Sequence, residues 1–320
     1  MSIHPDQQPI QSSPTGNKSG RSGDGSVDRR PVTITQLFEK KALGEPLVMV
    51  TAYDYPSATV VDEAGVDLVL VGDSAAMVVL GYPSTTPVSM DEMVMLSGAV
   101  RRGLKTPLLV GDMPFGSYEA SNEQAINNAQ RFIKEAGCDA VKLERGGASA
   151  ERAKAIVDAG IPVMGHVGLT PQSAVQLGGF RAQGRTAARG KEVIEEALEL
   201  QQAGCFAIVL EAVPSELTEA LVPHLSIPSI GIGAGPAADG QVLVYHDLLG
   251  IWQGRPAKFV RQYEQIREAM VRGVGAYAEE VRTREYPSSE HEYQMAPDEA
   301  HELQAWAAGI HNIGFSKNLG

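Results

Sequence analysis

The clearest fold signal lies at residues 68–74, which read Leu68-Val69-Leu70-Val71-Gly72-Asp73-Ser74. Four apolar residues in a row are followed there by a glycine, a carboxylate and a hydroxyl. A similar order recurs at Val110-Gly111-Asp112 and at Val141-Lys142-Leu143-Glu144. Runs that are continuously apolar, rather than alternating, are typical of strands buried on both faces of a parallel sheet. The sequence therefore predicts parallel strands whose carboxyl ends carry polar residues.

Short apolar runs and helical segments alternate along the chain. The runs expected to be strands are Leu47–Thr51, Leu68–Val71, Pro107–Gly111, Asp139–Leu143, Ile161–Gly165, Phe206–Leu210, Ile227–Gly231 and Val242–Tyr245. The segments expected to be helices are Tyr55–Ala64, Met90–Arg102, Asn122–Ala136, Ala150–Ala159, Lys191–Ala203 and Glu216–His224. Several of these helices are followed by glycine, whose left-handed conformation commonly stops a helix.

This alternation predicts an α/β fold, a (β/α)8 TIM barrel over residues 32–285, because such barrels contain eight strand–helix units in about 250 residues. The alternative is an open, doubly wound sheet. That fold would place a glycine-rich turn after the first strand. Thr51-Ala52-Tyr53-Asp54 stands there instead, so we expect the barrel.

Segments of different composition flank the predicted barrel. Residues 1–31 are rich in Gly, Ser, Pro, Asp and Gln, and they hold almost no large apolar side chains. Such a segment cannot bury enough apolar surface to offset its ordering entropy, so we expect a disordered tail. Residues 286–320 form a C-terminal extension, in which Pro287–Glu292 indicates a loop and Pro297–Gly309 a short amphipathic helix.

Charge and composition exclude several classes of protein. The net charge is -12, and no basic stripe supplies the electrostatic attraction that nucleic-acid binding requires. No apolar run approaches the roughly 20 residues needed to cross a bilayer, and the first thirty residues do not resemble a signal peptide. The two cysteines, Cys138 and Cys205, are too few for a disulfide framework. We therefore expect a cytoplasmic protein that binds neither nucleic acid nor membrane.

Polar residues gather at the predicted strand ends, which form the catalytic face of barrel enzymes. Asp73, Asp112 and Glu144 end three successive strands, so their carboxylates would converge and repel one another. A divalent cation would remove this repulsion, and ligation by oxygen alone favours Mg²⁺ first and Mn²⁺ second. The alternative is that one or two of the carboxylates cap helices or pair with Lys142.

Three further strand-end residues have candidate roles. Lys142 and Glu144 are two positions apart and so share one side of a strand, where Lys142 would neutralise a substrate carboxylate. A Schiff base is a second possibility for this lysine, but neighbouring carboxylates would keep it protonated. Glu211 lies further round the ring, where a general base would stay clear of the metal. His166 is either a structural residue or a substrate contact.

Two glycine-rich segments leave alternatives open. Gly231-Ile232-Gly233-Ala234-Gly235 follows the seventh strand, where many barrels bind phosphate, but tight turns also require such glycines. Gly178-Gly179-Phe180-Arg181-Ala182-Gln183-Gly184-Arg185 is either a mobile lid over an anionic substrate or an ordinary solvated loop.

These motifs, taken in order, resemble the ketopantoate hydroxymethyltransferase family over roughly residues 33–285. Besides the strand ends already quoted, the resemblance rests on Gly111–Phe115, Gly165–Gln172, Gly178–Gly184, Val209–Glu211, Gly231–Gly235 and Tyr245–Asp247. It implies a barrel of the phosphoenolpyruvate mutase and isocitrate lyase type. Two departures stand out: Arg145 lengthens the usual Glu-Gly-Gly, and Pro83 replaces what is more often Asp.

The resemblance also implies roles for individual residues. Asp73, Asp112 and Glu144 would surround one Mg²⁺ per subunit, and Glu211 would accept the C3 proton. The resemblance implies that Ser74, Asp112 and Lys142 would hold the oxo acid, and from their positions at the strand ends we count Asp73 and His166 among the candidate substrate-binding residues. The implied reaction joins 3-methyl-2-oxobutanoate, as a metal-stabilised enolate, to the one-carbon unit of 5,10-methylenetetrahydrofolate and gives 2-dehydropantoate. The family forms large homo-oligomers, often decamers.

Two rival functions differ in what they require. A lyase or mutase of the same superfamily would usually carry a reactive cysteine in a Lys-Lys-Cys-Gly-His type of loop, which the sequence lacks. A barrel that only supports an assembly would not need the strand-end residues, yet all of them are present.

Overall fold

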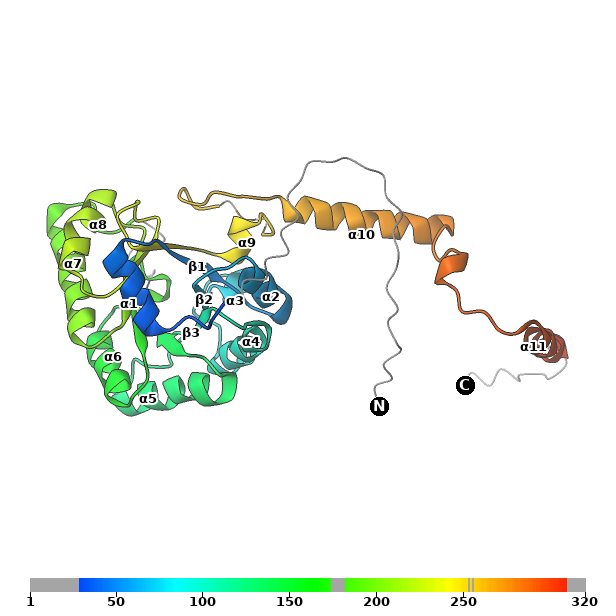
Figure 1. The fold of residues 1–320 in the computed structure, drawn as a ribbon, viewed down its shortest axis with the longest axis horizontal. Helices are drawn as coiled ribbons and strands as arrows, with labels where there is room; N and C mark the ends of the chain where they lie inside the picture. Colours follow the sequence, from blue (N-terminus) through cyan, green and yellow to red (C-terminus); the bar gives the residue numbers. More distant parts are fainter. Residues whose placement is uncertain (1–28, 174–181, 253, 255, 310–320) are drawn as a thin grey trace, which may run out of the picture.

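The computed structural model describes residues 29–173, 182–252, 254 and 256–309. Its centre is a closed parallel barrel in which each strand pairs with its neighbours in chain order and β8 pairs with β1 (Figure 1). The strands are β1 Leu47–Thr51, β2 Leu68–Val71, β3 Leu108–Asp112, β4 Ala140–Lys142, β5 Val163–Gly168, β6 Ala207–Glu211, β7 Ser229–Ile232 and β8 Gly240–Leu243. The predicted (β/α)8 barrel is confirmed.

Most predicted strands are correct to within a few residues, but the last one is misplaced. β8 spans Gly240–Leu243, whereas Val242–Tyr245 was expected. The strand starts early because Gly240 pairs with Leu47, whose carbonyl oxygen would lie 2.5 Å from any Cβ at that position. It stops early because Tyr245 begins a short helix, and its N–H donates to Thr51 Oγ1 at 2.9 Å.

Most helices of the described chain pack around the outside of the barrel, and the last two extend away from it (Figure 1). The helices are α1 Ile34–Leu43, α2 Tyr55–Glu63, α3 Ala75–Val78, α4 Met90–Gly103, α5 Asn122–Arg131, α6 Ser149–Asp158, α7 Ala187–Gln202, α8 Ser215–Leu221, α9 Tyr245–Leu248, α10 Ile266–Thr283 and α11 Pro297–Gly309. Side-chain caps fix several starts: Asp54, for example, accepts from the N–H of Ser57 in a capping box. The predicted helix Asn122–Ala136 is α5 followed by a π-helical turn, Phe132–Ala136.

The core has an inner and an outer part, as two-residue alternation along buried strands requires. The inner part fills the barrel with Leu47, Met49, Leu68, Leu70, Leu108, Val110, Ala140, Met164, Ala207, Val209, Ile230 and Val242. Leu37 of α1, a helix that the sequence analysis did not predict, belongs to the same cluster and is fully buried. The alternate residues, among them Val69, Leu109 and Val141, pack outward against the helices. α1 therefore contributes an apolar residue to the barrel interior.

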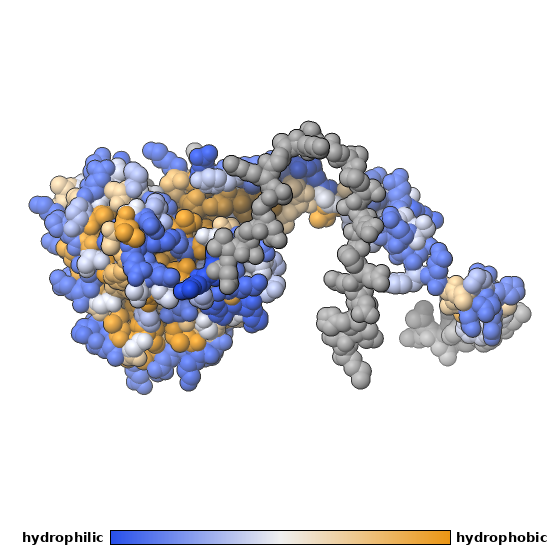
Figure 2. All heavy atoms as spheres, in the orientation of Figure 1, coloured by the Kyte–Doolittle hydropathy of each residue, from blue (hydrophilic) through white to orange (hydrophobic). Residues whose placement is uncertain are grey.

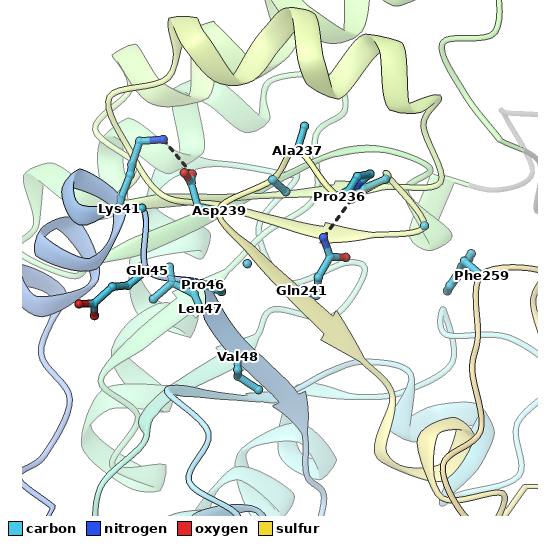
Figure 3. A pocket seen from close by; sticks show the side chains of 15 residues that line it. Lys41, Glu45, Pro46, Leu47, Val48, Pro236, Ala237, Asp239, Gln241 and Phe259 are labelled. Carbon is cyan, nitrogen blue, oxygen red and sulfur yellow. Dashed lines mark hydrogen bonds and ion pairs between the residues drawn. The ribbon is translucent and has the colours of Figure 1, made fainter.

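One side of the barrel is not covered by any helix that the structure describes. Only residues 233–239 join β7 to β8, and the outward residues Val48 of β1 and Gln241 of β8 are exposed. A groove of about 820 Å³ runs here, with Lys41 and Asp239 paired at 2.8 Å beside it and Phe259 further along (Figure 3). Figure 2 shows apolar surface on the side of the barrel from which α10 departs.

The C-terminal segments leave the barrel. α10 lies within the range expected for the barrel, yet it extends away from it, and none of its residues is buried (Figure 1). α11 has the bounds expected for the short C-terminal helix. Residues 1–28 of the expected disordered tail, and residues 310–320, lie outside the described residues. No helix in the described part of the chain has the length and apolar composition that crossing a bilayer demands.

The inner position of Leu37 gives a test of the fold. Leu37→Ala should lower the free energy of unfolding by about 2–5 kcal/mol, since it removes a fully buried side chain and leaves a cavity. Leu43→Ala changes an exposed residue of the same helix, and its effect should stay within about 0.5 kcal/mol. Urea denaturation measures both, and equal shifts in the two variants would contradict the placement of α1.

Candidate active site

The inward row of side chains changes from apolar to ionisable at one end of the barrel. Val110 is followed two residues later by Asp112, Ala140 by Lys142, Met164 by His166, and Val209 by Glu211. All of the strands are parallel, so these four ionisable residues share the carboxyl end. Asp112, Lys142 and His166 are no more than 3% exposed. The fold thus gathers opposite charges in one buried layer.

The three predicted metal ligands come from neighbouring strands, as expected. Asp73 follows β2, Asp112 ends β3, and Glu144 lies two residues beyond β4. The N–H of Asp73 donates to Asp112 Oδ2 at 3.1 Å, which ties the two loops together. Burial, and then the nearby Glu144, raise the pKa of Asp73 to about 6. Burial raises the pKa of Asp112 to about 6 as well, although Lys142 lowers it in part.

Lys142 forms a buried ion pair. Its Nζ lies 2.7 Å from Asp112 Oδ1, because the two residues are direct register partners across β3 and β4. Burial alone would lower the pKa of Lys142, but Asp112, Glu144 and Asp73 raise it above its usual value. The lysine is therefore charged at neutral pH, which argues against its acting as a Schiff-base nucleophile.

His166 lies between two carboxylates. Its Nδ1 is 3.5 Å from Glu144 Oε1, and its Nε2 is 3.3 Å from Glu211 Oε2, although neither contact has hydrogen-bond geometry. Burial and Lys142 lower the pKa of His166, but Glu144 and Glu211 outweigh them and raise it to about 9. A protonated imidazole thus separates Glu211 from the carboxylates of β2, β3 and β4.

Sequence reasoning missed two residues that hold this cluster. The side-chain amide of Gln172 donates to Asp73 Oδ2 at 3.0 Å, and its backbone N–H donates to Glu144 Oε2 at 3.0 Å. The Tyr118 hydroxyl donates to Gln172 Oε1 at 2.6 Å and accepts from the N–H of Glu144. Gln172 was quoted only as part of a motif, and Tyr118 follows β3 by six residues, so strand-end position could not identify either.

Ser74 is held by another residue that the sequence did not single out. The hydroxyl oxygens of Ser74 and Tyr53 are 2.8 Å apart, and burial raises the pKa of Tyr53, which keeps that phenol protonated. A cavity of about 180 Å³ opens beside these groups. Asp73, Ser74, Asp112, Lys142, Glu144, His166 and Glu211 all line it. The structure thus brings every predicted site residue to one cavity.

The structure describes the whole of the glycine-rich segment 231–235 but only part of the segment 178–185. Gly233 and Gly235 adopt positive φ, and the Phe259 ring and Ser215 fill the positions that their Cβ atoms would take. These contacts explain why both positions of the turn are glycine. Residues 178–181 of the expected lid lie outside the described residues, so the lid stays a prediction.

The carboxylates of the site differ in how free their oxygens are to bind Mg²⁺. Among residues 29–173, 182–252, 254 and 256–309, no three His, Cys, Asp or Glu side chains are arranged to hold one ion together. One oxygen of Asp112 pairs with Lys142 and one of Asp73 with Gln172. Mg²⁺ commonly uses one or two carboxylates and completes its shell with waters and substrate oxygens. Buried carboxylates with raised pKa values fit that mode, while the full set of three ligands stays a prediction.

Comparison with known proteins shows to which family the chain is related. A family model described as ketopantoate hydroxymethyltransferase matches residues 31–289. The 3-methyl-2-oxobutanoate hydroxymethyltransferase of Moorella thermoacetica is 54% identical over 268 residues, covering 84% of this chain and 100% of the relative. The mitochondrial 3-methyl-2-oxobutanoate hydroxymethyltransferase 1 of Arabidopsis thaliana is 51% identical over 293 residues, covering 89% of this chain and 84% of that protein.

Solved structures confirm the type of barrel. Phosphonopyruvate hydrolase superposes with a TM-score of 0.55 at 13% identity, covering 88% of this chain and 98% of that one. The 2,3-dimethylmalate lyase, a member of the phosphoenolpyruvate mutase/isocitrate lyase superfamily, gives a TM-score of 0.50 at 15% identity, with coverage of 86% and 98%. At these identities the likeness shows the fold alone.

The raised pKa of Asp73 predicts that the ionisation of this residue lowers the stability of the folded protein. Between the ordinary pKa of 3.8 and about 6, the folded state holds this proton more tightly than the unfolded state. The stability of the metal-free protein should therefore fall as pH rises through this window. Asp73→Asn cannot ionise, so it should gain up to about 3 kcal/mol relative to wild type between pH 4 and pH 7. Thermal unfolding in chelator measures the difference, with pH 4 as the control for packing. Parallel curves would contradict the shift.

Proposed function

The chain belongs to the ketopantoate hydroxymethyltransferase family, and we propose that it transfers a one-carbon unit from 5,10-methylenetetrahydrofolate to 3-methyl-2-oxobutanoate. The methylene carbon becomes the hydroxymethyl group of 2-dehydropantoate, water supplies its oxygen, and tetrahydrofolate is released. One observation carries the proposal: Glu211 lines the same cavity as the buried carboxylates, with His166 between them. The cavity thus offers a base and a separate site for an oxo acid.

The oxo acid would bind where the cavity is cationic and polar. Lys142 is the one lysine that lines this cavity in the described part of the chain, so it would neutralise the substrate carboxylate. The Ser74 hydroxyl, held by Tyr53, would donate a hydrogen bond to the same substrate. Asp73, Asp112 and Glu144 would hold Mg²⁺. When bound, this ion would polarise the 2-oxo group and make the C3 proton more acidic.

Glu211 would take the C3 proton. Its side chain is 17% exposed, whereas those of Asp112 and Glu144 are each 2% exposed, so Glu211 is more accessible than the predicted metal ligands Asp112 and Glu144. The ring of His166 lies 3.3 Å from Glu211 Oε2 on one side and 3.5 Å from Glu144 Oε1 on the other. His166 would therefore act through Glu211 and Glu144 rather than as a base itself.

The cysteine chemistry of the rival lyases has no support. Cys138 and Cys205 are both buried, and burial raises the pKa of each thiol to about 12. Neither lines the cavity. For the place of action we propose the cytoplasm, as expected from the sequence.

We also propose that the protein is a homo-oligomer, with α10 as a contact to a second copy. Met270, Val274, Tyr277 and Val281 follow a spacing of four, three and four residues along α10, and all are exposed. Such a stripe occupies one face of a helix. The groove on β1 and β8 would be the complementary surface, since no helix of the described part of the chain covers it (Figure 3).

The base role has a direct test. Wild-type protein with Mg²⁺ and 3-methyl-2-oxobutanoate in D2O should exchange the C3 proton without folate, as NMR can follow. Glu211→Gln should abolish this exchange and leave Mn²⁺ affinity, measured by electron paramagnetic resonance, nearly unchanged. Glu216→Gln alters an exposed carboxylate on α8 and should exchange normally. Normal exchange in Glu211→Gln would remove it from the base role. Absence of turnover with methylenetetrahydrofolate in the metal-loaded wild type would refute the activity.

The assembly proposal predicts a change in mass. Val274→Glu places a charge in the centre of the apolar stripe, so it should shift the protein to smaller species in light scattering after size exclusion. Arg272→Ala changes a residue outside the stripe that is 72% exposed, and should leave the mass unchanged. A monomeric wild type, or an unchanged mass in Val274→Glu, would contradict the contact.

A further inference from the structure

The cavity has two unlike sides. The side formed by β2 to β6 carries all of the ionisable residues used above. The side formed by β7, β8 and β1 is mainly apolar, with Ile232, Val242, Val244 and Phe259. It contains one carboxylate, Asp247 of α9, to which the proposed chemistry gives no role.

Asp247 is half-buried and lines the cavity. In the described part of the chain, no hydrogen bond or ion pair reaches its carboxylate, and burial raises its pKa. The short helix that carries it is firmly placed. The N–H of Tyr245 is bonded to Thr51, and the His246 ring packs on Tyr53 with their centroids 5.4 Å apart. An unpaired carboxylate held rigidly in a cavity is suited to a ligand that donates hydrogen bonds.

An aromatic ring forms part of the same wall. A Cβ at Gly233 would lie 2.4 Å from the Phe259 ring, so only glycine allows the ring to sit against the turn after β7. The apolar wall and the carboxylate thus come from different segments, both fixed by contacts with the barrel. A flat ligand with an apolar face and a donor edge would match both.

We propose that this side of the cavity binds the pteridine of the folate co-substrate, with Asp247 accepting hydrogen bonds from its 2-amino group and N3–H. This assignment rests on the proposed function. The two donors are parallel and fit the two oxygens of one carboxylate, as a guanidinium does. The oxo acid does not fit here, since Asp247 would repel its carboxylate and Lys142 lies on the opposite side. The donor of the one-carbon unit would then face the C3 carbon across the cavity.

The test separates the two substrates. Asp247→Asn keeps the shape of the side chain but replaces one carboxylate oxygen by an NH2 group, so a donor would face the donors of the pteridine. The KM for 5,10-methylenetetrahydrofolate should rise about 10- to 100-fold, while the folate-independent C3 exchange stays within about twofold of wild type. Glu264→Gln removes an exposed carboxylate from the segment after Phe259 and should change neither quantity.

A modified ligand sharpens the result. Calorimetry should show that tetrahydrofolate binds wild type more tightly than does its 2-desamino-2-methyl analogue, and that Asp247→Asn abolishes most of this preference. An unchanged folate KM, an equal loss of exchange and transfer, or an undiminished preference in the variant would overturn the assignment. If wild type itself shows neither exchange nor transfer, the proposed function fails independently of Asp247.

Discussion

The alternation of side chains along a closed parallel barrel is the constraint on which the site depends. Every second residue of each strand must point inward, where neighbouring strands leave no access to bulk water. For most of its depth this interior is filled by aliphatic residues such as Met49, Val110 and Met164. At the carboxyl end the same row becomes Asp112, Lys142 and His166. Buried charges are tolerated only when they are paired, so the acidic and basic side chains of this layer must compensate one another.

The positive charges in this layer do not fully compensate the carboxylates, and the uncompensated carboxylates are the groups available for chemistry. Lys142 compensates Asp112 at 2.7 Å, and His166 lies between Glu144 and Glu211. For Asp73 the charges of Lys142 and His166 and the Gln172 amide offset its burial and the nearby Glu144 only in part, and its pKa is raised to about 6. In the proposed function a divalent cation would relieve this excess of negative charge. Part of the stability of the fold would then be exchanged for affinity toward that cation.

The sequence was informative wherever structure follows from local pattern. Continuous apolar runs gave β1 and β2 without error, and strand-end position predicted four of the five acidic residues that line the cavity, Asp73, Asp112, Glu144 and Glu211, but not Asp247. The failures have a common physical cause, since they depend on contacts between distant segments. Nothing local to Ile34–Leu43 says that Leu37 enters the barrel, and nothing local to Gln172 says that its amide reaches Asp73 across 99 residues of chain. The start of β8 depends on Leu47, almost two hundred residues earlier.

Among the described residues one side of the barrel lacks helices, and this feature links the cavity to the proposed assembly. In a regular (β/α)8 barrel a helix follows β7 and another follows β8. Here a tight turn at Gly233 and Gly235 replaces the first, and the four-residue α9 stands directly after β8. The short turn lets Phe259 reach the mouth of the barrel, and α9 brings Asp247 there. In the described part of the chain no helix covers the outer faces of β8 and β1, and the apolar stripe proposed as their cover lies on α10, which extends away from the barrel. A second copy would supply that cover, so the proposed assembly and the positions of Phe259 and Asp247 would follow from the same departure from the regular barrel.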